Sequence, residues 1–345
     1  MTRRCIMHLA LTACALPASG AISAPVTNVP KMAKAVAMPP IGFGTFNNFE
    51  EPERVEDAVR SAIKKGYRMI DCARFYGNEK YVGRAIRAAI DAGEVERKEL
   101  FVCSKLWNAD AAPEDVEPAC RTSLADLQLD YLDCYYMHWP VQMTPDSGSD
   151  ANSKGRFGGV DFKLVHKGDC AECIRDTYAA MEKCADKGLA QHLGVSNFDE
   201  CLLDDLLAHC TRRPIANQIE LHPYLAQKDL VAYLQNEGIR PVAYAPLGSS
   251  GGDNGGPNLL KDPVITSIAE DLGKSTGQVI LRWGVQRGTS VIPKSLTEKR
   301  MDQNLDITSW SLTEAQMDQV NGLDRGLRFV RPPYFDFDEN KCASP

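Results

Sequence analysis

From about residue 50 onward the chain alternates between two patterns of hydrophobic residues. Apolar side chains first recur at helical spacing between residues 55 and 63, and an apolar run of strand length follows at 67–72. The alternation continues, with strand-like runs at 100–104, 131–137, 192–195, 215–219, 240–244 and around 291–292. Short, uniformly apolar strands that are each followed by a helix predict a parallel sheet covered by helices. About eight such units over roughly 250 residues predict a closed (β/α)8 barrel, a TIM barrel in a single domain.

The segments around this repeat divide the chain further. We expect the barrel to occupy residues 37–330, with an N-terminal extension at 1–36 and a C-terminal tail at 331–345 near the open end of the barrel. Two connections are polar and long, at 141–171 and at the Gly-rich residues 248–258. Long loops in compact domains are usually functional lids or disordered insertions. We favour a lid for 248–258 and leave both readings open for 141–171.

The extension has the features of a targeting segment. It begins with a positively charged Thr2-Arg3-Arg4 and continues as an Ala-rich apolar stretch to Ala24. A disordered extension, or translation that starts at Met32 or Met38, explains the same residues equally well. Beyond this extension, no apolar run approaches the ~20 residues that a membrane-spanning helix needs. The net charge of −7 argues against nucleic-acid binding, which normally requires a basic face.

The twelve cysteines are scattered through the chain. Cys72, Cys103 and Cys134 lie in apolar, strand-like runs, where a reduced thiol behaves as a small hydrophobic side chain. Cys170 and Cys173 form a lone CxxC without a second pair at zinc-site spacing. We interpret these two as surface thiols, with a redox or metal role as the alternative. The pattern favours a reducing compartment such as the cytoplasm, in conflict with a secretory N-terminus.

Polar residues stand at the predicted C-terminal ends of the strands, where barrels of this kind gather their reactive side chains. Asp71, Lys105 and His138 each follow a strand, and Tyr76 lies five residues beyond Asp71. The remaining polar residues at strand ends are Ser196, Asn197, Gln218, Tyr244, Lys294 and Ser295. Asp71, Tyr76, Lys105 and His138 each have a structural explanation when taken singly. Burying all four of these polar groups together is costly, however, unless they serve a function. No HxH or HExxH pattern is present, so we predict no metal site.

Seven stretches of the sequence resemble the aldo-keto reductase family, in order and at the family's spacing, over residues 38 to about 330. These stretches are Ile70–Glu79, Ser104–Trp107, Leu129–Asp133, His138–Pro140, Gly194–Phe198, Gln218–Tyr224 and Ile292–Ser295. The resemblance implies NADPH-dependent reduction of aldehydes or ketones to alcohols, on a small-molecule carbonyl substrate and in a monomer. It also implies that Asp71, Tyr76, Lys105 and His138 are the catalytic residues.

The chemistry of carbonyl reduction is consistent with these four roles. Negative charge develops on the carbonyl oxygen as hydride reaches the carbon, so a positioned acid such as Tyr76 is required. An ammonium such as Lys105 about 4 Å away supplies roughly 4 kcal/mol, enough to lower the pKa of a tyrosine by ~3 units. Asp71 would keep Lys105 charged, and a neutral His138 would orient the carbonyl oxygen.

The cofactor site follows from the resemblance, because the Gly-rich stretches do not complete a nucleotide-binding motif: Asn47 and Ile268 stand where glycines are required. Tyr244 is expected to stack on the nicotinamide ring, and Lys294 and Arg300 to bind the 2′-phosphate that distinguishes NADPH from NADH. The full set of expected cofactor-binding residues is Thr45, Asp71, Ser196, Asn197, Gln218, Tyr244, Leu247, Ser249, Lys294, Ser295, Arg300 and Asn304.

The substrate is expected to contact His138 and an apolar wall of Phe46, Trp107 and Trp139. Phe46 stands where many family members have Trp, which bears on the shape of that wall. Two other functions compete with the reductase. One is a non-catalytic NADPH-binding sensor on the same barrel. The other is a hydrolase, but its nucleophile motif at 194–198 ends in Phe198 in place of glycine.

Overall fold

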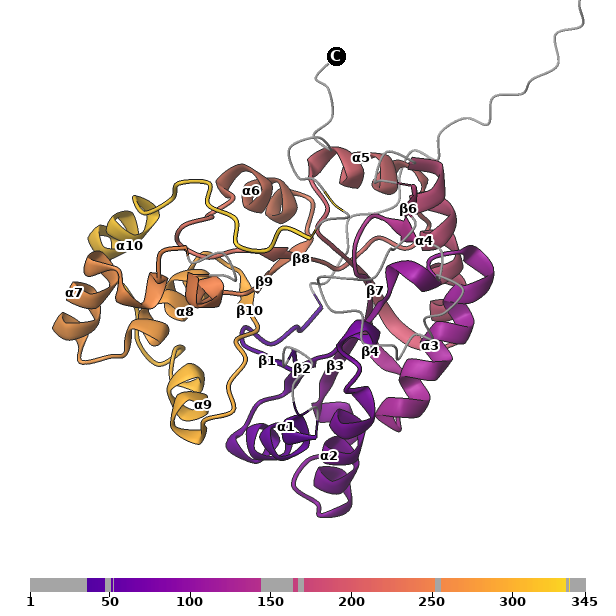
Figure 1. The fold of residues 1–345 in the computed structure, drawn as a ribbon, viewed down its shortest axis with the longest axis horizontal. Coiled ribbons are helices and arrows are strands. Elements are labelled where there is room, and N and C mark those ends of the chain that lie inside the picture. Colours follow the sequence, from indigo (N-terminus) through magenta and orange to yellow (C-terminus); the bar gives the residue numbers. More distant parts are fainter. Residues whose placement is uncertain are drawn as a thin grey trace, which may run out of the picture.

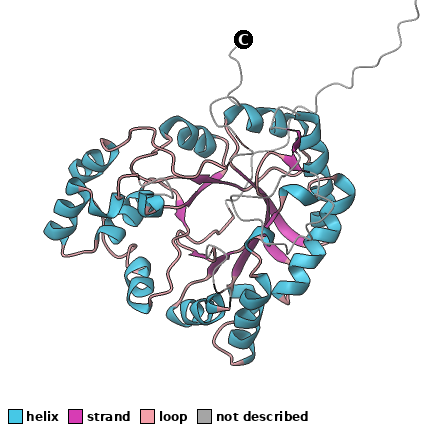
Figure 2. Ribbon diagram, viewed as in Figure 1, coloured by secondary structure: helices cyan, strands magenta, loops and turns pink. Residues whose placement is uncertain are grey.

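The computed structural model describes residues 36–46, 51, 53–143, 164–166, 171–251, 256–332 and 335. In this part of the chain, one parallel sheet has the strand order β1-β2-β3-β4-β7-β8-β9-β10. The helices form an outer layer around these strands (Figure 1 and Figure 2). The strands of the sheet are β1 (Phe43–Gly44), β2 (Met69–Asp71), β3 (Phe101–Leu106), β4 (Leu132–Met137), β7 (Ala190–Ser196), β8 (Ala216–Glu220), β9 (Arg240–Tyr244) and β10 (Ser290–Val291).

The sheet closes where its first and last strands meet. Ile41 forms a parallel bridge with Val291, and the backbone N–H of Gly42 donates to the carbonyl of Val291 at 2.8 Å. At Gly44 a Cβ atom would come within 2.7 Å of the Ile292 carbonyl oxygen, so the close approach of the two strands requires glycine. The predicted (β/α)8 barrel is confirmed.

The helices follow the strands as the alternating pattern predicts. Their bounds are α1 (Arg54–Lys65), α2 (Glu79–Asp91), α3 (Pro113–Leu127), α4 (Ala171–Asp186), α5 (Glu200–His209), α6 (Lys228–Asn236), α7 (Pro263–Leu272), α8 (Thr276–Gln286), α9 (Glu298–Leu305) and α10 (Glu314–Asn321). Helix α1 buries the apolar residues that show helical spacing and ends at Gly66, whose φ of 109° suits glycine. Helix α8 was not predicted; it begins at the Ser275 cap directly after Gly273 ends α7.

Two apolar layers hold the barrel together. A large cluster fills the space between the sheet and the helices, with Val59, Ile86 and Leu124 among its buried members. A smaller cluster includes Met69 and Tyr136. It is formed mainly by strand side chains that alternate along the strands with those of the large cluster. Because both layers are packed, polar side chains gather where the strands end.

Parts of the predicted loops and termini lie outside the described residues: 1–35, 144–163, 167–170, 252–255 and 336–345. Of the loop at 141–171, the structure describes the antiparallel strands β5 (Gln142–Met143) and β6 (Leu164–His166). Of the strip at 248–258, it describes the short helix η4 (Gly248–Gly251) and residues from 256 onward. The proposed lid and targeting roles therefore stay predictions. No helix among the described residues is long and apolar enough to span a membrane.

The cysteines follow the sequence analysis in part. Cys72, Cys103 and Cys134 are free and buried, as predicted. Cys173 is disulfide-bonded, as is Cys201 at the start of α5, so the interpretation of Cys173 as a surface thiol is wrong. Sequence spacing cannot show this, because a disulfide depends on which side chains the fold brings within bonding distance. Cys170 lies outside the described residues.

Candidate active site

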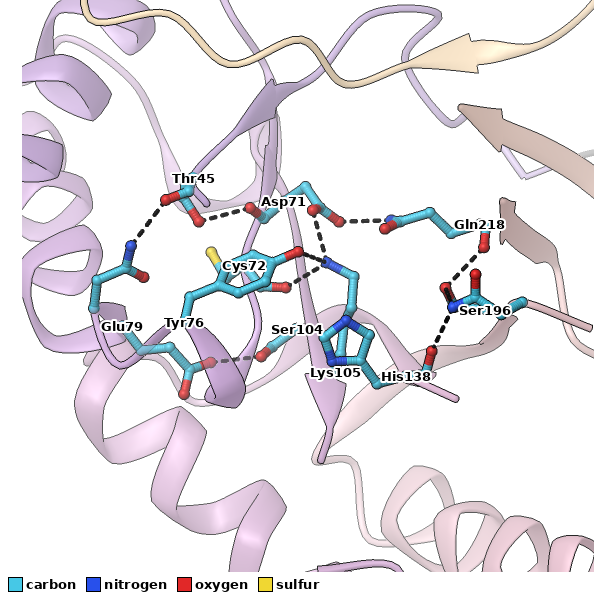
Figure 3. Close-up of polar contacts among 12 residues, drawn as sticks. Thr45, Asp71, Cys72, Tyr76, Glu79, Ser104, Lys105, His138, Ser196 and Gln218 are labelled. Carbon is cyan, nitrogen blue, oxygen red and sulfur yellow. Dashed lines mark hydrogen bonds and ion pairs between the residues drawn. The ribbon is translucent and has the colours of Figure 1, made fainter. Parts of the chain in front are cut away.

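The ammonium of Lys105 lies at the centre of the polar network at the strand ends (Figure 3). Its Nζ donates to Asp71 Oδ2 at 2.7 Å, to the carbonyl of Cys72 at 2.9 Å and to the hydroxyl of Tyr76 at 3.1 Å. The side chain of Lys105 is 0% exposed. Strand β3 carries Lys105, β2 ends with Asp71, and the short helix η1 (Arg74–Tyr76) positions the phenol. The fold thus brings the three residues together as the sequence predicted.

Asp71 is held from its other side as well. Its Oδ1 accepts a hydrogen bond from Gln218 Nε2 at 2.7 Å, and its backbone carbonyl accepts one from Thr45 Oγ1 at 2.8 Å. Asn78, which the sequence analysis did not single out, donates to the backbone carbonyl of Thr45 at 2.8 Å. These bonds join strands β1, β2 and β8, so the position of the carboxylate depends on the closed barrel.

Burial and neighbouring charges set the protonation of Tyr76 and Lys105. Burial raises the pKa of Tyr76 to about 12, and the charge of Lys105 offsets only part of this effect. The expectation that Lys105 lowers the pKa of Tyr76 below its ordinary value is therefore wrong, because removal of the phenol from water has the larger effect. Burial alone lowers the pKa of Lys105, but Asp71 and Tyr76 outweigh it and the pKa is raised. At neutral pH the site thus holds a protonated phenol and an ammonium.

His138 lies just beyond the end of β4. Its ring centroid is 6.0 Å from that of Tyr76 and 5.5 Å from that of Trp107. Burial and the nearby charge of Lys105 hold the pKa of His138 well below its usual range, so the imidazole is neutral as predicted. Neither ring nitrogen has a hydrogen-bond partner among the described residues, and Nδ1 is buried. This imidazole is available to a ligand.

A second polar group connects strands β4, β7, β8 and β9. Ser196 Oγ donates to the carbonyl of Gln218 at 2.7 Å, and Asn197 Nδ2 donates to the carbonyl of His138 at 3.0 Å. The hydroxyl of Tyr244 donates to Asn197 Oδ1 at 2.8 Å. Asn197 has a φ of 65°, a left-handed conformation that Asn tolerates better than most residues. The four residues are therefore close together, as expected of a common binding surface.

The chain that follows β9 has a left-handed backbone at two non-glycine residues. Ala245 has a φ of 45° and Ser249 has a φ of 44°. Such conformations cost about 1–3 kcal/mol each and cluster at ligand sites. Leu247, between them, packs against the large apolar cluster.

The expected phosphate-binding residues lie around the start of α9. Lys294 and Arg300 are exposed, and neither has an acidic partner among the described residues. Partial desolvation of the ammonium and the neighbouring charge of Arg54 lower the pKa of Lys294. Ser295 Oγ accepts a hydrogen bond from the backbone N–H of Thr297 at 3.0 Å, just before α9. Lys294 and Arg300 can therefore form charge-assisted hydrogen bonds with an anionic ligand, and a nucleotide phosphate is such a ligand.

Asn304, the expected adenine contact, lies at the end of α9. It is buried and hydrogen-bonded to the hydroxyl of Tyr67. Its side chain therefore has a structural partner within the helix layer.

An apolar cluster stands beside His138, and we call it the mouth cluster. Its buried members are Trp107, Trp139, Val141, Met143 and Phe335, and Phe75, Ala109 and Val330 pack against it. Phe75 stacks on Trp107 with centroids 3.9 Å apart, while Phe46 lies 5.1 Å from Tyr76. Phe75 was missed in the sequence, although its position next to Tyr76 is a usable signal. Phe335 packs 5.5 Å from Trp139, which brings part of the C-terminal tail to this end of the barrel.

The described residues contain no group of three or more His, Cys, Asp or Glu side chains that could hold a metal ion. The site is therefore built from a buried ammonium, a phenol, a neutral imidazole and a set of amides and hydroxyls.

Comparisons with known proteins agree with this geometry. Residues 40–325 match the family model described as the Aldo/keto reductase family. Aldo-keto reductase family 1 member A1 from Homo sapiens is 44% identical over 299 residues, which cover 86% of this chain and 89% of the relative. The protein of the same name from Gallus gallus is 43% identical, covering 86% and 88%. The structure of the aldose reductase from Schistosoma japonicum superposes with a TM-score of 0.75 at 36% identity, covering 87% of this chain and 93% of that one. The chain therefore belongs to the aldo/keto reductase family and is an NADPH-dependent oxidoreductase that reduces aldehydes or ketones to alcohols.

Proposed function

We propose that Tyr76 donates the proton in this reduction, and the hydrogen bond of 3.1 Å between its hydroxyl and Lys105 carries the proposal. NADPH, when bound, supplies the hydride that reaches the carbonyl carbon. As negative charge grows on the carbonyl oxygen, the phenol of Tyr76 transfers its proton to that oxygen. Lys105 stabilises the phenolate that remains, and Asp71 keeps Lys105 in place at 2.7 Å.

His138 would orient the substrate. A neutral imidazole that has no partner at either nitrogen among the described residues can donate one hydrogen bond to a carbonyl oxygen held near Tyr76. A charged imidazole beside Lys105 would be repelled, so the low pKa of His138 fits this role.

The residues around the second polar group would hold the cofactor. Ser196, Asn197 and Gln218 present hydroxyl and amide groups for the carboxamide, and Tyr244 presents a half-buried ring for stacking. Thr45 and Asp71 lie at the same edge. Leu247, Ser249, Lys294, Ser295 and Arg300 would contact the phosphates, and Asn304 the adenine. Lys294 and Arg300, which have no acidic partner in the part of the chain that the structure describes, favour the extra phosphate of NADPH.

The mouth cluster would form the wall of the substrate site together with Phe46. Trp107 and Trp139 contribute flat apolar surfaces beside His138. An apolar wall favours aldehydes with hydrocarbon or aromatic substituents. The monomeric state, the cytoplasmic location and the role of residues 1–36 stay predictions.

The proposal is tested by following NADPH consumption with a panel of aldehydes across pH. Because the pKa of Tyr76 is about 12, reduction should show no loss from this group between about pH 6 and 9. Oxidation of the corresponding alcohol requires the phenolate and should accelerate as the pH rises. A reduction rate that falls through neutral pH with loss of one proton would contradict the assignment of Tyr76.

A further inference from the structure

A buried carboxylate outside the proposed catalytic group binds the C-terminal segment of the chain. Glu220 is the last residue of β8 and is 0% exposed. Its Oε1 accepts the backbone N–H of Phe329 at 2.7 Å, and its Oε2 accepts that of Val330 at 3.1 Å. These residues are 109 and 110 positions away in sequence. In Figure 1 the yellow segment after α10 runs back towards β8.

Further contacts show that Glu220 is built into this position. His222 Nε2 lies 3.0 Å from Oε1, and Arg328 Nη1 lies 3.7 Å from Oε2. The side chain of His222 is itself 0% exposed, and its ring is 5.0 Å from that of Phe329. Both carboxylate oxygens are therefore occupied by donors from residues 328–330 or from the loop that follows β8. A fully buried carboxylate requires such donors, because unpaired it would be strongly destabilising.

The two anchored residues point to two different parts of the site. Val330 packs against the mouth cluster that contains Trp107 and Trp139. Phe329 approaches Gly248, where an added Cβ atom would come within 3.2 Å of its ring. Gly248 opens the strip that follows β9. The hydrogen bonds of Glu220 to residues 329 and 330 thus position two contacts at once: that of Val330 with the mouth cluster and that of Phe329 with Gly248.

We infer that Glu220 is a positioning residue that fixes Val330 in the wall of the substrate site, an inference that rests on the proposed function of the mouth cluster. Glu220 itself touches no reacting atom. Its effect passes through the backbone of residues 329 and 330. Selectivity between bulky and small aldehydes, rather than the chemical step, is what this anchor controls.

The test compares Glu220→Gln with a matched control, Glu182→Gln. Glu182 is also buried and accepts two backbone N–H groups, from Thr211 at 2.7 Å and Arg212 at 2.6 Å, but it lies in α4. Phe329 and Val330 bond to different oxygens of Glu220, so the amide of Glu220→Gln leaves one of these backbone N–H groups facing a second donor. Both N–H groups at Glu182 bond to Oε1, which Gln keeps, so the control removes a buried carboxylate charge without removing the acceptor of either backbone N–H.

In Glu220→Gln we expect KM for benzaldehyde to rise about tenfold, while kcat/KM for acetaldehyde changes less than about twofold. Glu182→Gln should change neither KM for benzaldehyde nor kcat/KM for acetaldehyde. Equal losses for both aldehydes in Glu220→Gln, or the same selectivity change in the control, would overturn the inference. Should Glu220→Gln fail to fold, Val330→Ala keeps the anchor and removes the wall contact, so it must reproduce the rise in KM for benzaldehyde.

Hydrogen exchange of the full chain provides a readout that does not need turnover. The peptide with Phe329 and Val330 should exchange about tenfold faster in Glu220→Gln, with β2 and β3 unchanged. Unaltered exchange in that peptide overturns the anchor whether or not the enzyme is active. Failure of the wild-type protein to reduce either aldehyde would instead refute the proposed function.

Discussion

The two faces of strand β3 carry neighbouring residues into two different buried networks. Lys105 points to the inner side and meets Asp71 at 2.7 Å and Tyr76 at 3.1 Å. Ser104 points to the helix layer, where its hydroxyl donates to Glu79 Oε1 at 2.5 Å. Ser123 of α3 donates to the other oxygen of Glu79 at 2.9 Å. Figure 3 draws Lys105 with Asp71 and Tyr76, and Ser104 with Glu79.

The two networks differ in how a buried carboxyl group is accommodated. Asp71 has a buried ammonium within hydrogen-bonding distance, so its charge is compensated. Glu79 has two hydroxyl donors and no cation bonded to it among the described residues, and burial raises its pKa to about 7 despite these donors. The inner network is thus organised around charge that can assist a proton transfer. The outer network is organised around a proton held near neutral pH.

The largest effect is expected at the inner network when the transferable proton is removed. Tyr76→Phe should lower kcat for aldehyde reduction by about 10²–10⁴-fold, because the variant lacks the acid. Its affinity for NADPH, measured by fluorescence titration, should stay close to that of the wild type. Normal turnover in this variant would remove Tyr76 from the mechanism.

Removal of the cation should break the inner network itself. Lys105→Met leaves Asp71 buried and unpaired, which should reduce the free energy of unfolding by about 3–5 kcal/mol. The double variant Asp71→Asn/Lys105→Met should recover most of this loss in urea unfolding. On the outer face, Ser104→Ala should cost only about 1–3 kcal/mol. If Lys105→Met reduces the free energy of unfolding no more than Ser104→Ala does, the two faces of β3 do not differ in this way.

The outer network predicts a pH-dependent stability. The folded state binds the proton of Glu79 more tightly than the unfolded chain, whose pKa is near 4.5. Its stabilising contribution is therefore complete below about pH 4.5 and is lost as the pH rises through about 7, by about 3 kcal/mol in all. Glu79→Gln should remove this part of the pH dependence in urea unfolding measured from acidic to mildly alkaline pH. An unchanged profile would mean that Glu79 is not the group responsible.

The smallest effect is expected at Lys294 and Arg300, for which the described ranges of the chain offer no carboxylate partner. Arg300→Ala should weaken NADPH binding by about tenfold, because a charge-assisted contact is worth about 1.5–3 kcal/mol. NADH, which lacks the 2′-phosphate, should bind almost as well as to the wild type. Titration with both cofactors measures the ratio, and equal losses would refute the phosphate site.

Local sequence patterns account for much of the site. The short strand after α1 and the Gly66 cap follow from hydrophobic spacing and glycine chemistry, and they place Asp71 at a strand end. The same reasoning places Lys105 and His138. It does not find α8, because only three residues separate that helix from α7. It also does not find Phe75 or Glu220, whose partners are distant in the chain.

The sequence by itself determined the order of strands and helices, because hydrophobic period is a property of neighbouring residues. It also determined which ionisable groups reach the open end of the barrel. Only the tertiary structure decided what those groups experience there. The pKa of Tyr76 depends on burial among β2, β3 and η1, and the partners of Glu220 come from a segment more than 100 residues away. Desolvation and long-range hydrogen bonds exist only once the sheet has closed, so no local pattern encodes their balance.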